Sequence, residues 1–294
     1  MKWIDYASPH TVKEAVTLLA EKGDAARAMA GGTDLIVEMR VGRRTPALVV
    51  DIKGIPELNE ITYTTEDGLT LGAAVPCYKI YNNKAVIKNY PGLVDAASII
   101  GGTQIQGRAS IGGNLCNAAP SGDAIPALIA LGAKAKIAGV NGTRIVNVED
   151  FCLAPRQTVV KPGELLVSLS IPAPKANTGA RYIRFIPRNE MDIAVVGVGV
   201  SVELNGSTFK SARVSLASVA PKPLFVKEAG DALAGKPISE ASIEKAAELA
   251  AAAAKPISDM RGTAEYRKHL CAVLTRRALN AAIERTRGGT VNAH

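Results

Sequence analysis

Two glycine-rich segments, about 80 residues apart, constrain the possible folds of this chain more than any other feature. The first is Ala30-Gly31-Gly32-Thr33-Asp34 and the second is Ser110-Ile111-Gly112-Gly113-Asn114. The first stands where an expected strand passes into an expected short helix, so its bare backbone can approach an anion closely. Each segment alone is also compatible with an ordinary tight turn. Together they favour a ligand with two linked phosphates.

Neither segment matches the common nucleotide-binding motifs. The chain contains no GxxxxGK[ST] motif, which excludes a Walker loop, and the glycines lack the GxGxxG spacing of a nicotinamide-binding Rossmann site. A phosphate-binding function therefore has to come from another fold.

Residues 1–57 alternate strand and helix. Thr11 and Glu14 form a capping box before a helix that Gly23 ends, and strands are expected at 3–6, 27–30 and 48–51. This βαβαβ-like unit is too short for a complete doubly wound domain. We expect it to be a first subdomain.

Residues 58–175 carry the signals of a second subdomain. Hairpins are expected at 61–71 and 133–148, and a further strand at 165–171 ends at a pair of prolines. Helices are expected at 78–88, 93–100 and 123–131.

Residues 176–294 follow a different pattern. Long strands at 181–185, 193–204 and 211–217 precede helices at 239–253 and 263–287. Strands followed by helices predict a small α+β domain with an antiparallel sheet. The fold class of the whole chain is therefore α+β.

The charge balance is basic but uneven. The chain has 35 Lys and Arg against 27 Asp and Glu, and a surplus of five positive charges falls within residues 255–287. Aromatic residues make up only 4% of the chain, which supplies few platforms for stacking nucleic-acid bases. The basic segment fits a solvated helix face, or a surface for an acidic protein or a phosphate-bearing ligand.

The composition also excludes several classes of site and location. The four cysteines, at positions 77, 116, 152 and 271, lack zinc or iron–sulfur spacing and are expected to be buried thiols. No run of about 18 uncharged apolar residues predicts a membrane span, and the N-terminus lacks a signal-peptide profile. We therefore expect a cytoplasmic protein that does not span a membrane and binds no metal.

At this point the motifs identify a family. Residues 30–35 (AGGTDL), 108–115 (RASIGGNL) and 119–123 (APSGD) resemble the flavin-binding segments of the FAD-binding medium subunit of molybdenum hydroxylases. Residues 164–172 and 192–196 occupy the expected order and spacing. The family includes the flavoprotein of aerobic carbon monoxide dehydrogenase and the flavin domain of xanthine dehydrogenase, and the resemblance runs almost end to end.

The resemblance implies a two-subdomain FAD-binding fold of the vanillyl-alcohol-oxidase/PCMH type, followed by a C-terminal domain of the CO dehydrogenase flavoprotein type. It implies cofactor contacts from both glycine segments, namely Ala30, Gly31, Gly32, Thr33, Asp34, Leu35, Ser110, Ile111, Gly112, Gly113, Asn114 and Asn117. It also implies that Asp123 accepts from a ribose or ribitol hydroxyl, that Leu165 and Leu166 lie beside the isoalloxazine ring, and that Arg184 is a nearby cation. On residue type alone, Asp123 is equally compatible with a helix N-terminal charge, and the leucines with plain core.

The function that the resemblance implies is electron transfer within a multi-subunit oxidoreductase. FAD on this chain would receive electrons from a [2Fe–2S] small subunit, after substrate oxidation on a molybdopterin-containing large subunit, in a dimer of heterotrimers. No side chain needs to act as a nucleophile, and the three histidines show no triad pattern. We expect no catalytic residue in this chain. Residues 187–191 do not reveal the electron acceptor.

Two other functions remain open on the sequence. One is a self-contained flavin-dependent reductase of the same superfold, which needs a proton donor facing the flavin. The other is a basic nucleic-acid-binding module that uses residues of the C-terminal segment, namely Arg261, Arg267, Lys268, Arg276 and Arg277. These arginines and the lysine do not form one continuous helical stripe, which weakens the second alternative.

Overall fold

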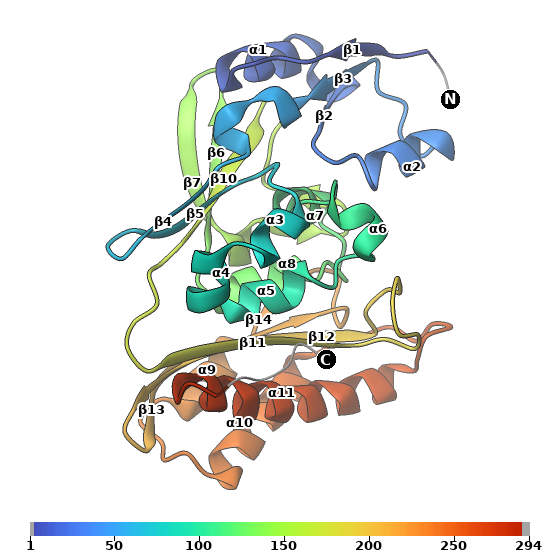
Figure 1. Cartoon of the computed structure of the whole chain (residues 1–294). Coiled ribbons are helices and arrows are strands. Elements are labelled where there is room, and N and C mark those ends of the chain that lie inside the picture. The colour runs from blue at the N-terminus through green and yellow to red at the C-terminus, as the bar shows by residue number, and fades with distance from the viewer. Residues whose placement is uncertain (1–2, 290–294) are drawn as a thin grey trace.

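Three β-sheets, stacked in chain order, organise the computed structural model, which describes residues 3–289 (Figure 1). The first sheet has three strands, the second has five and the third has four, and a two-stranded ribbon accompanies the second. Helices lie between the second and third sheets and on the outer face of the third (Figure 1). The mixed architecture confirms the predicted α+β class.

The first unit is a parallel sheet in the order β1-β3-β2. Its elements are β1 (Asp5–Ala7), α1 (Val12–Lys22), β2 (Ala26–Met29), α2 (Leu35–Arg40) and β3 (Leu48–Asp51). The Thr11 hydroxyl accepts a hydrogen bond from the Glu14 N–H, and Gly23, with a φ of +49°, ends α1. The predicted helix and its two ends are confirmed.

The second unit is an antiparallel sheet in the order β4-β5-β10-β6-β7. Its strands are β4 (Ile61–Thr64), β5 (Gly68–Gly72), β6 (Lys134–Gly139), β7 (Gly142–Asn147) and β10 (Leu165–Ile171), with a ribbon of β8 (Cys152–Ala154) and β9 (Gln157–Thr158). Its helices are α3 (Cys77–Tyr81), α4 (Lys84–Asn89), α5 (Pro91–Ala97), α6 (Thr103–Gln106), α7 (Ile111–Asn117) and α8 (Ala124–Ala130).

The second glycine-rich segment forms the start of helix α7, where the sequence predicts a loop. Ser110 is its N-cap, and the Ser110 hydroxyl accepts from the Gly113 N–H at 3.0 Å. Gly112 lies against the backbone of Ala73, so that a Cβ there would be 2.3 Å from the Ala73 carbonyl oxygen. The glycines are helical because the cap and this close packing outweigh their low helix propensity.

The third unit is an antiparallel sheet in the order β11-β12-β13-β14. Its elements are β11 (Thr178–Phe185), β12 (Val196–Asn205), β13 (Thr208–Ala217), β14 (Leu224–Phe225), α9 (Lys227–Leu233), α10 (Glu240–Ala253) and α11 (Ala264–Thr286). Helix α9 was not expected from the sequence. Strand β12 starts three residues later than predicted, because residues 193–195 belong to the loop that joins it to β11.

Helix α8 joins the second unit to the third sheet (Figure 1). Ser215, Arg213 and Ser201 donate to the carbonyl oxygens of Pro126, Ile129 and Ala130, at 2.9, 2.9 and 2.6 Å. These donors link the third sheet to carbonyls in the second half of α8, of which the Ile129 carbonyl also accepts from the Gly132 N–H. A Cβ at Gly199 would lie 2.3 Å from the Pro126 oxygen, so the glycine lets α8 pack directly on β12.

The apolar core is divided in the same way as the sheets. One cluster fills the second unit and another lies between the third sheet and helices α9–α11. A third, under α1, includes Leu165 and Val167 of β10, so the first unit completes its core with residues of the second. In the described part of the chain, no helix has the length and apolar character needed to cross a lipid bilayer.

Candidate functional site

A cleft of about 530 Å³ lies between the first and second units. It contains most of the residues predicted for cofactor binding, drawn from both glycine segments and from the start of β10: Ala30, Gly31, Gly32, Thr33, Asp34, Leu35, Ser110, Gly112, Gly113, Asn114, Asn117, Leu165 and Leu166. Segments that are far apart in sequence therefore meet around one space.

The two glycine segments are in direct contact. Arg108 Nε donates to the Gly31 carbonyl oxygen at 2.9 Å. A Cβ at Gly31 would lie 1.9 Å from the Arg108 carbonyl oxygen, a distance that no real side chain tolerates. Glycine at position 31 is therefore required for the two backbones to approach each other.

The first segment offers unpaired backbone donors. Gly32 has a φ of +74°, in the left-handed region that glycine adopts readily. Within residues 3–289, the N–H groups of Gly32, Thr33 and Asp34 make no hydrogen bond to another protein group. Gly32 and Thr33 are partly buried and Asp34 is exposed, and these N–H groups at the start of α2 are free to donate to a bound acceptor.

The second segment contributes open space to the cleft as well as hydrogen-bond donors. Gly113 is exposed, and a Cβ there would approach only the Ser110 hydroxyl, at 3.0 Å. Asn114 joins α7 to α8, since its Oδ1 accepts from the Ala124 N–H at 3.2 Å. Its side-chain amide group retains donors for a ligand. Ile111 points away, into the core, and is fully buried.

An apolar wall completes the cleft. Leu165 and Leu166 are 4% and 3% exposed at the start of β10, and Ile100 and Leu153 line the same space. The motifs did not predict Ile100 and Leu153 as lining residues, nor the polar lining residues Cys116, Arg156 and Lys161. In the sequence, the turn residues Pro162 and Gly163 before β10 could have indicated this part of the cleft.

The charges in the cleft are balanced around Glu38. This buried carboxylate accepts from Arg44 and forms an ion pair with Arg156 at 3.0 Å. Burial raises the pKa of the nearby Asp34, and the charge of Glu38 raises it further, whereas Arg156 opposes the shift. The cleft surface therefore combines the cations of Arg44 and Arg156 with the carboxyl groups of Asp34 and Glu38.

Asp123 and Arg184 lie outside the cleft lining and pair with each other. Arg184 Nη1 is 2.8 Å from Asp123 Oδ2, and the Tyr182 hydroxyl donates to Asp123 Oδ1 at 2.7 Å. Burial raises the pKa of Asp123, and these two partners counteract the shift. The pair connects the start of α8 to β11. Each oxygen still has a lone pair for one more donor.

The four cysteines are free and carry buried thiols, as expected. Cys77, Cys152 and Cys271 are buried residues; Cys116 is an exposed residue of α7 that lines the cleft, but burial raises the pKa of its thiol to about 12. Burial raises the pKa of Cys77 to about 12, which keeps that thiol protonated and unreactive at neutral pH.

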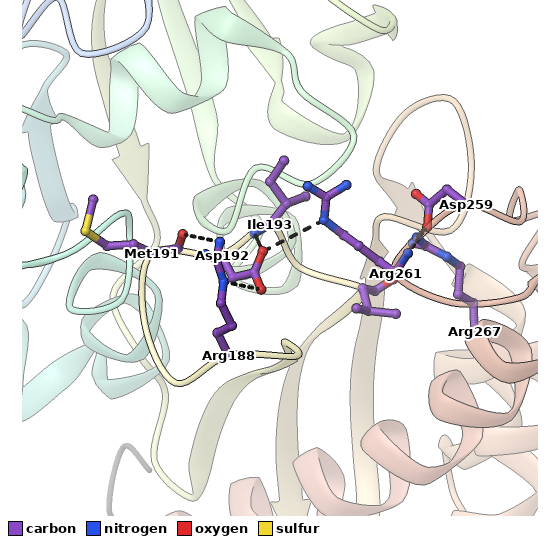
Figure 2. Close-up of polar contacts among 8 residues, drawn as sticks. Arg188, Met191, Asp192, Ile193, Asp259, Arg261 and Arg267 are labelled. Atoms are coloured by element: carbon purple, nitrogen blue, oxygen red, sulfur yellow. Dashed lines mark hydrogen bonds and ion pairs between the residues drawn. The ribbon is translucent and has the colours of Figure 1, made fainter.

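The loop between β11 and β12 extends towards the second unit. Figure 2 shows Asp192 between Arg188, whose Nε is 3.2 Å from Asp192 Oδ2, and Arg261, at 3.8 Å from Oδ1. Met191 has a φ of +52°, and a Cβ at Gly102 would lie 2.9 Å from its Cγ. Ion pairs thus order an exposed loop whose Met191 lies against Gly102 of the second unit.

Comparisons with known proteins give the family. Residues 2–174 match the FAD binding domain in molybdopterin dehydrogenase, and residues 181–282 match the CO dehydrogenase flavoprotein C-terminal domain. The chain belongs to the FAD-binding subunits of molybdenum hydroxylases. The resemblance that the motifs indicated is confirmed, and so is the order of an FAD-binding part followed by a C-terminal sheet domain.

Curated and solved members of this flavoprotein family align over nearly the whole chain. The carbon monoxide dehydrogenase medium chain of Afipia carboxidovorans is 34% identical and the alignment covers 96% of this chain and 98% of the relative. The xanthine dehydrogenase FAD-binding subunit of Escherichia coli O157:H7 is 29% identical, with 95% and 97% covered. A carbon monoxide dehydrogenase structure from Hydrogenophaga pseudoflava superimposes with a TM-score of 0.93 at 32% identity, with 97% and 98% covered.

The cleft fits the cofactor that this flavoprotein family binds. Its volume lies within the range of about 300–1,000 Å³ for small-molecule and cofactor sites. Unpaired N–H groups at Gly32, Thr33 and Asp34 suit a diphosphate, and the leucines of β10 suit an aromatic ring. FAD is therefore compatible with both the polar and the apolar part of the cleft.

The two alternative functions are not supported. The relatives are subunits of dehydrogenases, which favours the electron-transfer function over a self-contained reductase. Two of the arginines considered for nucleic-acid binding already form hydrogen bonds within the protein. Arg267 is 3% exposed and donates to the Val195 carbonyl oxygen, and Arg276 donates twice to Glu244.

Proposed function

We propose that this chain holds FAD in the cleft between its first two units and transfers electrons from an iron–sulfur subunit of a molybdenum hydroxylase complex to an external acceptor. The observation that carries the proposal is the contact between the two glycine segments, made through Arg108 and Gly31. Because of this contact, the backbone N–H donors of the first segment lie next to the open space beside the second segment.

In this proposal the glycine segments hold the diphosphate and the ribitol. Gly32, Thr33 and Asp34 donate backbone N–H groups, and Thr33 adds its hydroxyl. Bare backbone at Gly113 leaves room for phosphate oxygens, while Asn114 and Asn117 donate from their amides. The remaining members, Ala30, Gly31, Leu35, Ser110, Ile111 and Gly112, hold the backbone of the two segments in position.

The ring is assigned to the apolar end of the cleft. Leu165 and Leu166 pack beside the isoalloxazine and exclude water from it. Although Asp123 and Arg184 lie outside the cleft lining, we propose that Asp123 accepts from a ribitol hydroxyl with the lone pairs left by Tyr182 and Arg184, and that Arg184 supplies positive charge behind it. FAD, when bound, supplies the ability to accept and release electrons, and the protein supplies position, electrostatics and exclusion of solvent. No side chain of this chain is assigned a catalytic step.

The partners follow from the relatives. One of them is a subunit of the 6-hydroxypseudooxynicotine dehydrogenase complex of Paenarthrobacter nicotinovorans, and another is a carbon monoxide dehydrogenase medium chain. We infer a molybdopterin-containing large subunit and a [2Fe–2S] small subunit, assembled as a cytoplasmic dimer of heterotrimers. Domain boundaries at 57/58 and 175/176 are consistent with the sheet to which each strand belongs.

The experiment is a titration of the purified apoprotein with FAD, followed by anaerobic reduction. We expect saturable binding with an oxidised-flavin spectrum, and bleaching of that spectrum by the oxidisable substrate only when both partner subunits are present. Absence of FAD binding contradicts the assignment of the cleft. Bleaching by an organic substrate without partners contradicts the electron-transfer function.

A further inference from the structure

Arg156 occupies a turn position at which glycine is usual. Ala154 pairs with Gln157 at the end of the β8–β9 ribbon, so the turn between them consists of Pro155 and Arg156. Proline fixes φ at about −65° at the first of these positions. Arg156, at the second, has a φ of +63°, and this combination is typical of a type II turn, which favours glycine or asparagine there. Such backbone strain in a residue other than glycine is concentrated at ligand-binding and active sites.

The backbone and the side chain of Arg156 reach opposite sides of the cleft. Its N–H donates to the carbonyl oxygen of Ala118 at 3.0 Å, directly after α7, the helix that contains the second glycine segment. Its Nη1 lies 3.0 Å from Glu38 Oε1 on α2, the helix that follows the first glycine segment. Arg156 lines the cleft together with residues of both segments. The side chain therefore spans the cleft between the two helices.

The guanidinium of Arg156 is available to a second acceptor. Its side chain is 49% exposed, against 29% for Arg44, and within residues 3–289 it forms the ion pair with Glu38 and no side-chain hydrogen bond. Glu38 does not depend on it, because Arg44 Nε donates to the other oxygen of the same carboxylate. By contrast Arg27, another cation of the lining, already donates to two backbone carbonyl oxygens. The five N–H donors of a guanidinium suit the oxygens of a phosphate.

The location of Arg156 distinguishes it from Lys161, which also lines the cleft. The Lys161 N–H donates to Glu164 Oε2 at 2.7 Å, so Lys161 lies at the start of β10, where the isoalloxazine ring is assigned. Arg156 lies by the first glycine segment instead. Burial raises the pKa of Asp34 in that segment, the charge of Glu38 raises it further, and the charge of Arg156 opposes the shift. The available cation on the diphosphate side of the cleft is therefore Arg156.

We propose that Arg156 is a cofactor-binding residue, whose guanidinium donates to the diphosphate of FAD held at residues 32–34. This inference rests on the proposed function, which assigns the diphosphate to the first glycine segment. Glu38 keeps the Arg156 side chain over the cleft, and its carboxylate stays paired with Arg44 when the guanidinium turns to the phosphate oxygens. A hydrogen bond between two charged groups is stronger than one between neutral groups. The contact explains why the turn has an arginine where glycine would be unstrained.

The test is a fluorescence titration of the full-length apoprotein with FAD. Arg156→Gln should weaken FAD binding by about tenfold or more, because a charge-assisted hydrogen bond is lost. Arg156→Lys should recover part of the affinity, since lysine keeps the charge without the planar fork. The loss of affinity on adding salt should be smaller in Arg156→Gln than in the wild type. At saturating FAD the absorbance spectrum of the bound flavin should match the wild type, because the diphosphate lies away from the ring.

A double-mutant cycle separates contact with the cofactor from a role through Glu38. Glu38→Gln removes the carboxylate that pairs with Arg156, and Arg156→Gln is then introduced into this background. A direct contact with the diphosphate predicts at least the same loss of FAD affinity in both backgrounds. Disappearance of the loss in the Glu38→Gln background would show that Arg156 acts only through Glu38 and would overturn the inference.

Arg156→Gly tests the turn apart from the side chain. Glycine adopts a positive φ without strain, so this apoprotein should melt at a higher temperature than Arg156→Gln but bind FAD as weakly. Arg43→Gln is the matched control, because Arg43 is exposed just after α2 and, within residues 3–289, does not line the cleft. It should bind FAD like the wild type.

Wild-type FAD affinity in Arg156→Gln or Arg156→Gly overturns the inference. A shifted spectrum of the bound flavin in Arg156→Gln also overturns it, because the side chain would then act on the ring and not on the diphosphate. A wild-type chain that binds no FAD contradicts the proposed function instead, so the two failures are distinguishable.

Discussion

Arg285 holds Asp95 through two hydrogen bonds, of 2.6 and 2.8 Å, across 190 positions of the chain. Asp95 lies on α5 of the second unit and is 3% exposed, and Arg285 lies near the end of α11. The same carboxylate accepts from the Tyr182 N–H at 3.0 Å and pairs with Arg181 at 3.1 Å. One buried acidic group therefore connects α5, β11 and α11.

Replacing Asp95 by Asn should destabilise the protein strongly. The substitution leaves two arginines in a buried site without their counter-charge, and breaking a buried ion pair on one side costs about 3–5 kcal/mol. Urea unfolding of the full-length chain measures the change. Asp231→Asn, which breaks the exposed pair with Lys227 on α9, should cost less than about 1 kcal/mol. Equal losses in the two variants would show that the Asp95 site contributes no more than a surface pair.

Replacing Gly31 by Ala should separate the two glycine segments. The new Cβ would lie 1.9 Å from the Arg108 carbonyl oxygen, so one backbone has to move and the hydrogen bond from Arg108 to Gly31 is lost. We expect a lower melting temperature together with a reduction of FAD affinity by about tenfold or more. Gly107→Ala is the control, because its Cβ would meet nothing within 4 Å. Wild-type FAD affinity in Gly31→Ala would contradict the importance of this contact.

Replacing Gly113 by Val should affect FAD without affecting the fold. The added side chain enters the cleft, where its Cβ approaches only the Ser110 hydroxyl. Fluorescence titration should show that FAD retention is lost, whereas circular dichroism and the melting temperature of the apoprotein stay close to wild type. Unchanged flavin content in this variant would count against the assignment of the second segment to the cofactor.

The stability of the apoprotein should fall in acid partly because of Glu164. Arg144 donates to both of its oxygens and lowers the pKa of this cleft-lining carboxyl. A folded-state pKa below the unfolded value of about 4.3 gives stability that is present above that value and lost as the pH falls through the lower, folded pKa.

Unfolding curves from neutral pH down to about pH 3 measure this effect, since the loss lies below the usual glutamate pKa. Glu164→Gln should lose less stability than the wild type over the acid part of the range. Parallel curves for the two proteins would exclude Glu164 as a source of the pH dependence.

Elements with strong local signals could be predicted from the sequence. The cap at Thr11 and the stop at Gly23 determine α1 locally, and Asn141, in the two-residue turn before Gly142, marks the turn between β6 and β7. Helix α7 was missed because its glycines are poor helix formers, and the packing of Gly112 on Ala73 is a tertiary effect. Such a contact cannot be predicted from the neighbouring residues in the sequence.

The candidate site could be predicted from the sequence where its residues belong to recognisable motifs. Both glycine segments and the leucines of β10 line one cleft, as expected. The pairing of Asp123 with Arg184 was not foreseen, because two residues 61 positions apart meet only after α8 packs on the third sheet. Arg156 and Lys161 were missed for a similar reason, since they belong to irregular segments without periodicity.

The hydrogen bonds from Ser201, Arg213 and Ser215 to the end of α8 have a consequence for any attempt to express the flavin-binding part by itself. A gene fragment that stops after residue 175 removes all three donors and uncovers the side of α5 and α8 on which the third sheet rests. The fragment would therefore expose apolar surface and is expected to aggregate more readily than the full-length chain. The C-terminal part is thus an integral packing partner of the flavin-binding part rather than a separable domain.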